Sequence, residues 1–158
     1  MKWKFWITLV LLFLLINEYL TEFLLALLVG EMDLSSAYES TFRYFSLDSY
    51  IDAATYRSIP YVALALFSAK SKLRQFSLGK LALWASVFCL AAFHFCGYWS
   101  MQHSLFTPAH TSSTSTLAIV FIPIWALIYG VLGYALLFVG LKTYRLFQKV
   151  YSTLLTWR

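Results

Sequence analysis

The chain has 158 residues, of which 61% are hydrophobic and only 12% are charged. A soluble domain is about 45–50% apolar and about 25% charged, so the composition excludes an ordinary soluble protein and indicates an integral membrane protein. The net charge of +5 does not indicate nucleic-acid binding, because the basic residues cluster at the ends of apolar segments.

The first apolar segment covers residues 5–30 and follows two lysines, Lys2 and Lys4. A membrane helix needs about 20 apolar residues, with some allowance for tilt, so this segment is long enough to cross a bilayer. No small-x-small cleavage site follows its apolar run, which favours a retained first span over a signal peptide. Glu18 and Glu22 interrupt the segment and share one face of a helix.

A polar and aromatic connector covers residues 31–50. Its larger apolar residues have helical spacing, which predicts a short helix at the membrane interface; they are Leu34, Tyr38, Phe42 and Phe45. All seven acidic residues of the chain lie between Glu18 and Asp52. This asymmetry suits a loop on the outer side of the membrane, although acidic residues contribute little to orientation.

Two more spans are predicted at residues 51–69 and 81–99, on either side of a basic loop at residues 70–80. The basic residues of this loop place it in the cytoplasm; they are Lys70, Lys72, Arg74 and Lys80. Cys89 and Cys96 lie in the third span. A helix separates them by about 10 Å, which is beyond the reach of a disulfide, so they do not indicate a thiol–disulfide enzyme.

The fourth predicted span covers residues 116–140 and contains Pro123, which favours a kink. Its small residues allow a neighbouring helix to approach closely; they are Ala126, Gly130 and Gly133. A basic tail covers residues 141–158. Its mixture of basic and aromatic residues predicts an amphipathic helix, which either extends the fourth span into the cytoplasm or lies on the inner leaflet.

Together these segments predict an all-α fold: one domain over residues 1–158, built as a four-span antiparallel bundle in the inner (plasma) membrane. Both termini are expected in the cytoplasm. A three-span arrangement, in which residues 51–69 insert only partly, would divide the basic segments of the chain between the two sides of the membrane. We reject it for that reason.

This orientation gives approximate depths for the polar residues of the spans. One residue from each span lies about 18–21 Å from the cytoplasmic end of its helix: Glu18, Arg57, His94 and Tyr129. An ionisable group in the middle of the membrane costs about 2.5–3.5 kcal/mol and usually faces a bundle interior or a cavity. We therefore expect a buried polar layer at this depth. Glu22 and Asp52 lie at about 27 Å, near the outer interface.

Two interpretations of this layer stay open. In the first, Glu18 and Arg57 form a buried ion pair that holds the first two spans together, and His94 and Tyr129 complete its hydrogen bonds. In the second, the layer lines a wet cavity in which Glu18 or His94 exchanges protons or an ion. The cytoplasmic half of every span is apolar, which favours the first interpretation because it leaves no visible proton path.

A group of potential metal ligands is predicted at the outer ends of the third and fourth spans: Cys96, Met101, His103 and His110. Sulfur and imidazole suit Cu(I) or Zn(II), but the spacing matches no defined metal motif. The Ser- and Thr-rich residues 111–116 are explained by helix capping and show no base-activated nucleophile. We therefore expect no cofactor and no catalytic site.

Three classes of function remain. The first is a non-enzymatic protein that acts through another membrane protein or through self-association: an immunity-type protein against a pore-forming toxin, a defence component or an accessory subunit. The second is an oligomeric proton or ion channel, or a transporter subunit, that uses the polar layer. The third and weakest is a membrane metalloprotein or enzyme that uses the outer histidine, cysteine and methionine group.

Overall fold

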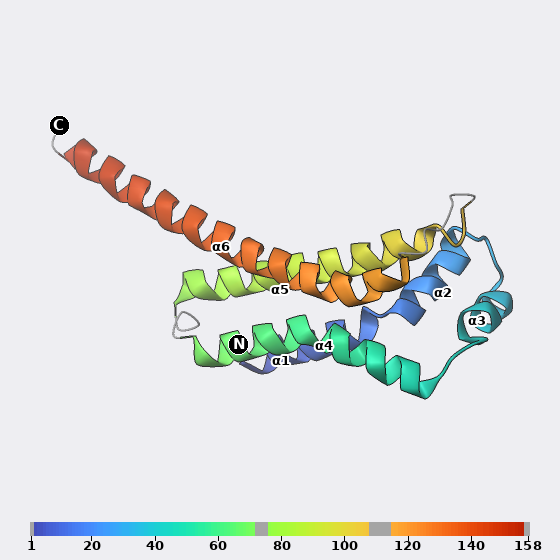
Figure 1. The fold of residues 1–158 in the computed structure, drawn as a ribbon. Helices are drawn as coiled ribbons and strands as arrows, with labels where there is room; N and C mark the ends of the chain where they lie inside the picture. Colours follow the sequence, from blue (N-terminus) through green and yellow to red (C-terminus); the bar gives the residue numbers. More distant parts are fainter. Residues whose placement is uncertain (1, 72–75, 108–114, 157–158) are drawn as a thin grey trace.

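The computed structural model describes residues 2–71, 76–107 and 115–156, and within them every regular element is a helix and no strand is present (Figure 1). The all-α prediction is therefore confirmed. The helices are α1 (Lys2–Leu15), α2 (Glu18–Leu28), α3 (Leu34–Phe42), α4 (Leu47–Lys70), α5 (Ser77–His103) and α6 (Ser115–Thr156).

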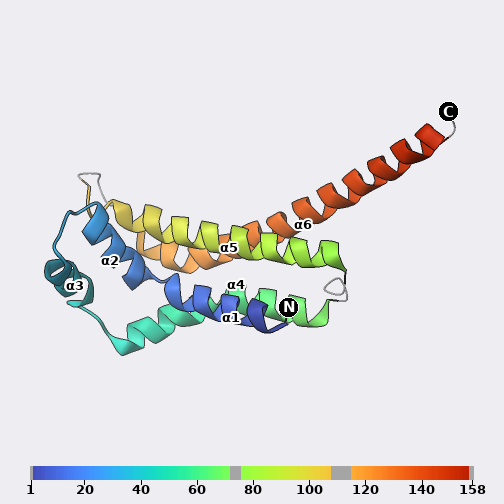
Figure 2. The same ribbon diagram turned by 180° about the vertical axis from the view of Figure 1, so that it is seen from behind.

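The long helices lie side by side along one axis, and the short helices close one end of the bundle (Figures 1 and 2). α5 packs mainly against α6, α1 packs against α4, and α2 packs against α3 and α5. The N-terminus lies at the opposite end from α3, next to the end of α4. An apolar core joins α1, α4, α5 and α6; its buried residues are Phe5, Leu9, Tyr61, Leu64, Leu83, Val87, Leu90 and Ala126.

The first predicted span is not one helix. It divides into α1 and α2, which meet at an angle of 61°. Asn17 stabilises both sides of the break, because its side chain donates to the Leu14 carbonyl at 2.9 Å and accepts from the Leu20 N–H at 2.8 Å. These bonds satisfy backbone groups that a helix end would otherwise leave unpaired. The division therefore depends on a single polar side chain.

Two of the described helices are long and apolar enough to cross a membrane, namely α5 and residues 120–148 of α6. The bent α1–α2 pair would make a third crossing if it acts as one broken span. α4 does not meet the same criterion, and its 24 residues include Asp48, Asp52, Arg57 and Lys70. The predicted all-helical fold is thus present, but two of the described helices meet the criterion for crossing a membrane and four crossings remain a proposal.

The predicted fourth span and the basic tail form one continuous helix. α6 has 42 residues, which corresponds to a length of about 60 Å, roughly twice the hydrocarbon thickness of a bilayer. Its C-terminal half leaves the bundle and projects beyond the end of α4 and the start of α5 (Figures 1 and 2). The sequence left two arrangements open for the basic tail. In the structure the tail continues the helix of the predicted fourth span.

Small residues bring α5 and α6 into close contact. Ala126 is fully buried. A Cβ atom added at Gly130 would lie 3.2 Å from the Leu90 Cβ, and one added at Gly133 would lie 2.9 Å from the Cys89 Cβ. There is no room for a side chain at Gly133 unless the helices separate.

Replacement of Gly133 by leucine should therefore destabilise the bundle by about 1–3 kcal/mol, the usual cost of overpacking. The measurement is the free energy of unfolding in mixed detergent micelles. Gly140→Leu is the matched control on the same helix, because a Cβ at Gly140 meets no atom within 4 Å. Equal effects of the two substitutions would contradict the packing role of Gly133.

A short helix is present within the predicted connector as α3, and Asp33 caps it. The Asp33 carboxylate accepts from the Ser35 and Ser36 N–H groups at 3.1 and 3.2 Å. Hydrogen bonds from the side chain and backbone of Ser36 hold the pKa of this carboxyl below its usual value. α3 is fixed to the bundle through Phe42, whose ring stacks on the Tyr19 ring of α2 with centroids 5.8 Å apart.

We expect the amide shifts of Ser35 and Ser36 to titrate with a midpoint below the ordinary aspartate value of 3.8. Because the folded pKa is lowered, the cap contributes stability above the unfolded pKa and loses it as the pH falls through the folded pKa. NMR of the detergent-solubilised chain measures this. Asp33→Asn keeps a capping oxygen and should hold these amide shifts constant; a wild-type midpoint at or above 3.8 would contradict the cap.

Candidate functional site

The central interaction of the site joins the broken first span to α4. α2 begins at Glu18, directly after the break. The Glu18 carboxylate, at the start of this helix, is directed into the bundle. Arg57 lies in the middle of α4 and is completely buried. Arg57 Nη1 donates to Glu18 Oε2 at 2.6 Å. These are the two residues that the depth argument expected to pair.

Aromatic rings enclose the guanidinium group of Arg57. Its Nη2 donates to the Tyr50 hydroxyl at 3.1 Å. The same group lies over the rings of Phe13 and Tyr50, with its central carbon 5.2 and 5.1 Å from their centroids. A desolvated cation–π contact stabilises by about 2 kcal/mol. The charge therefore has one ionic partner and two aromatic faces, contributed by α1, α2 and α4.

α5 contributes the second half of the site through His94, Tyr98 and Gln102. The Tyr61 hydroxyl of α4 hydrogen-bonds to His94 Nδ1 at 3.2 Å. The His94 ring also stacks between the Tyr61 and Tyr98 rings, with centroid distances of 5.6 and 5.0 Å. Gln102 donates to the backbone carbonyl of Glu18 at 3.0 Å. We call the whole set the buried polar cluster: Glu18, Tyr50, Arg57, Tyr61, His94, Tyr98 and Gln102.

The cluster is buried but not fully paired. Several of its polar atoms are inaccessible and have no hydrogen-bond partner among the described residues: Glu18 Oε1, Arg57 Nε, His94 Nε2, the Tyr98 hydroxyl oxygen and Gln102 Oε1. An unsatisfied buried polar group costs about 1–3 kcal/mol, and such groups are normally paired with protein or with ordered water. The cluster thus has the capacity to bind small polar species between α2, α4 and α5.

Tyr129 lies elsewhere. Its ring stacks on Phe93, with centroids 3.5 Å apart and planes 4° from parallel, and it also contacts Trp125. The hydrogen-bonding role expected for Tyr129 beside the ion pair has no counterpart among the described contacts. Depth alone selected this residue, but Tyr129 and Phe93 face each other across the α5–α6 contact and away from Arg57.

The two outer acids behave differently from Glu18. Glu22 is half-buried on α2, and Asp52 is exposed on the first turns of α4. No hydrogen bond or ion pair between them is present in the described part of the chain. They have the exposure expected of residues near an interface.

Four members of the cluster were not predicted from the sequence, although their spacing contains a signal. Tyr61 follows Arg57 by four residues, and Tyr50 precedes it by seven, so all three share one face of α4. Tyr98 and Gln102 likewise follow His94 at intervals of four. A search for polar residues at helical spacing from Arg57 and His94 would have found them.

The candidate metal ligands do not form a site in the described residues. Cys96 is exposed, Met101 and His103 are half-buried, and His110 lies outside the described residues. No group of three or more histidine, cysteine or acidic residues close enough to hold a metal ion is found in residues 2–71, 76–107 and 115–156. Cys89 and Cys96 are free thiols.

No family model matches the chain, and no curated protein or solved structure matches it either. The geometry of the buried polar cluster and of the helix surfaces is therefore the basis for assigning a function.

Removal of either partner of the ion pair should destabilise the protein by about 3–5 kcal/mol, because the remaining charge stays buried without a partner. We expect Glu18→Ala and Arg57→Ala each to show this loss, and the double variant to lose less than their sum. Thermal or chemical unfolding in detergent measures all three.

The exposed pair Glu39–Arg43 is the matched control. Its closest atoms are 4.0 Å apart and both side chains are more than half exposed, so Glu39→Ala should change stability little. Strict additivity of the Glu18 and Arg57 substitutions would contradict a direct interaction.

Proposed function

We propose that the chain crosses the membrane four times, with both termini in the cytoplasm. α5, α6 and the bent α1–α2 pair supply three crossings, and α4 supplies the fourth. The Glu18–Arg57 pair supports the crossing of α4. An arginine in the middle of a membrane costs about 2.5–3.5 kcal/mol, and here it is neutralised by a carboxylate 2.6 Å away and enclosed by protein.

The distribution of charge along the bundle supports the orientation. Basic residues at the end of the bundle that contains the N-terminus include Lys4, Lys70 and Lys80, and the projecting part of α6 adds Lys142 and Arg145. The acidic residues belong to α2, to α3 with the turn before it and to the start of α4, toward the other end. Positively charged segments tend to remain in the cytoplasm, which supports a cytoplasmic N-terminus and a cytoplasmic projecting half of α6.

Single cysteines test this topology after Cys89 and Cys96 are replaced by alanine. In intact cells a membrane-impermeant maleimide should label Glu39→Cys in α3, while Lys80→Cys and Gln148→Cys should react only after permeabilisation. If α4 does not cross, Glu39→Cys and Lys80→Cys will lie on the same side of the membrane. Labelling of Lys80→Cys or Gln148→Cys in intact cells would therefore contradict four crossings with both termini inside.

Within this topology we propose a non-enzymatic protein that acts by binding another membrane protein, as an immunity-type protein, a defence component or an accessory subunit. The supporting observation is that the buried polar cluster is closed toward the cytoplasm by the apolar core formed by α1, α4, α5 and α6. A single copy thus offers no continuous polar path. By contrast, α6 exposes apolar side chains along its length, including Phe121, Val131 and Phe147, which provide a surface for a partner or a second copy.

The second candidate is an oligomeric proton or ion channel, or a transporter subunit. The unpartnered polar atoms of Glu18, His94 and Tyr98 favour it, because ionisable groups inside a membrane often mark ion or proton pathways. In this alternative, several copies would enclose a path that one copy lacks.

Proteoliposomes that contain only this chain distinguish the two candidates. With a pH-sensitive dye inside and a pH step across the bilayer, we expect no flux above that of empty liposomes. Proton flux that is lost in Glu18→Gln would contradict the first candidate and support the channel. For the immunity-type case, cells that express the chain should survive a co-expressed pore-forming toxin domain that kills control cells, and a charge-reversed Arg57→Glu variant should not protect.

A further inference from the structure

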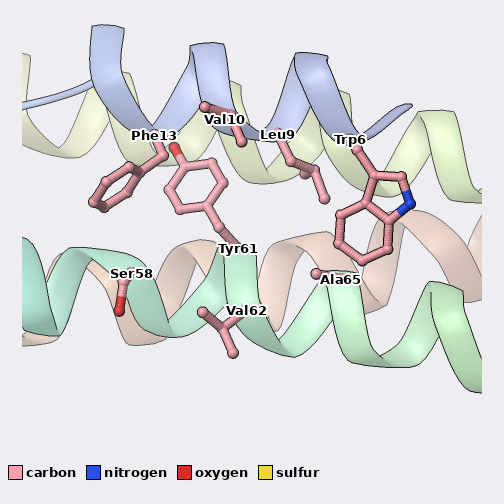
Figure 3. Close-up of a pocket in the computed structure, with 8 residues that line it drawn as sticks. All are labelled: Trp6, Leu9, Val10, Phe13, Ser58, Tyr61, Val62 and Ala65. Atoms are coloured by element: carbon pink, nitrogen blue, oxygen red, sulfur yellow. The ribbon is translucent and has the colours of Figure 1, made fainter. Parts of the chain in front are cut away.

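A long apolar slot lies between α1 and α4, on the side of the bundle away from α5 and α6 (Figure 3). Its volume is about 220 Å³. Trp6 and Ala65 line one end, and Phe13 and Ser58 line the other. Seven residues separate the two ends on each helix, which corresponds to a length of about 10 Å. The slot is therefore long and narrow rather than round.

The surface of the slot is apolar, although Trp6 at one end carries an indole N–H. Two of its lining residues carry hydroxyls, and both are already bonded: Ser58 donates to the Thr55 carbonyl at 2.7 Å, and the Tyr61 hydroxyl is paired with His94. The remaining surface consists of aliphatic and aromatic carbon. Val10 and Val62 at the open side are 56% and 51% exposed, so in a membrane the slot faces the lipid. Its shape and lining fit an extended hydrocarbon chain.

One end of the slot is basic. Ala65 precedes Lys70 by five residues on α4, and Trp6 follows Lys4 by two on α1, so the slot opens toward the end of the bundle where both lysines lie. Lys4 and Lys70 are exposed. All acidic residues of the chain lie between Glu18 and Asp52, beyond the opposite end of the slot. The charge at the opening therefore selects an anionic headgroup over a zwitterionic one.

We propose that the α1–α4 slot binds one acyl chain of an anionic phospholipid of the inner leaflet, whose phosphate is held by Lys4 and Lys70. The proposal rests on the membrane placement given above. It adds a specific lipid as a partner, at a site separate from the protein-binding surface of α6.

Two rings of the slot connect this lipid to the buried polar cluster. Tyr61 contacts the slot with its ring and hydrogen-bonds to His94 with its hydroxyl. Phe13 contacts the slot on one side and carries the Arg57 guanidinium over its ring at 5.2 Å. The two rings also meet edge to face, with centroids 5.8 Å apart. The Tyr61 ring would thus lie between His94 and an acyl chain in the slot. The Phe13 ring would lie between Arg57 and the same acyl chain.

Native mass spectrometry of the purified chain in an uncharged maltoside detergent tests the proposal. Phosphatidylglycerol and phosphatidylcholine are the probes, added separately at the same concentrations. The wild-type chain should retain one phosphatidylglycerol molecule at a concentration at least tenfold lower than that needed for phosphatidylcholine. Ala65→Phe fills the slot and should abolish this preference, as should Ser58→Phe at the other end.

Ala63→Phe is the matched control. It lies two residues from Ala65 on α4 but lines a different pocket, between α4, α5 and α6, so it should retain the phosphatidylglycerol adduct. The double variant Lys4→Gln, Lys70→Gln leaves the slot intact and should reduce the affinity for phosphatidylglycerol to that for phosphatidylcholine. A second readout is the imidazole NMR signal of His94, which should shift on addition of phosphatidylglycerol in the wild type but not in Ala65→Phe.

Three outcomes would overturn the proposal: equal retention of the two lipids by the wild type, an unchanged adduct in both slot-filling variants, or loss of the adduct in Ala63→Phe alone. The adduct is measured on the isolated chain, without a protein partner or an ion gradient. A failure to detect the lipid adduct is therefore distinguishable from a failure of the labelling, flux or protection experiments, because those experiments do not measure lipid binding.

Discussion

The ion pair between Glu18 and Arg57 is the constraint on which the rest of the structure depends. Each residue alone would be costly to bury, and the two lie on different segments: the second half of the bent α1–α2 pair and the least apolar of the long helices. Their contact at 2.6 Å joins these segments. Three other side chains bond to the ion pair or cover it: Phe13, Tyr50 and Gln102. As a result, residues of α1, α2, α4 and α5 all meet at this buried ion pair.

The break at Asn17 is what makes this contact possible. In a straight helix Glu18 would continue the direction of α1, whereas the 61° bend turns α2 toward α5 and brings the Glu18 carbonyl within 3.0 Å of Gln102. The cost of interrupting the helix is offset because Asn17 bonds to both sides of the break. Asn17 thus makes the first segment less apolar, and the same residue positions the Glu18 carboxylate.

The cluster and the helix surfaces point to different roles. Inside, the ion pair is strongly held, but Glu18 Oε1, His94 Nε2 and the Tyr98 hydroxyl have no partner in the part of the chain that the structure describes, and the apolar core separates them from the end of the bundle that contains the N-terminus. This arrangement stabilises the bundle more readily than it conducts. Outside, α6 is exposed over much of its length and the α1–α4 slot is open on one side. The surfaces are therefore where partners are to be sought, and Tyr61 and Phe13 are the residues that connect the surface to the interior.

The sequence by itself determined the helical class, the approximate position of each apolar segment and the small residues between α5 and α6, because these follow from composition and local spacing. It also indicated the pairing of Glu18 with Arg57, as one of two interpretations, from the cost of buried charge. Only the tertiary structure decided that the first segment is broken, that α6 continues through the tail, and that Tyr61, Tyr98 and Gln102 complete the cluster while Tyr129 does not. The physical reason is that depth in the membrane fixes one coordinate of a side chain. The direction in which it points depends on how each helix is rotated and bent against its neighbours, which no single segment encodes.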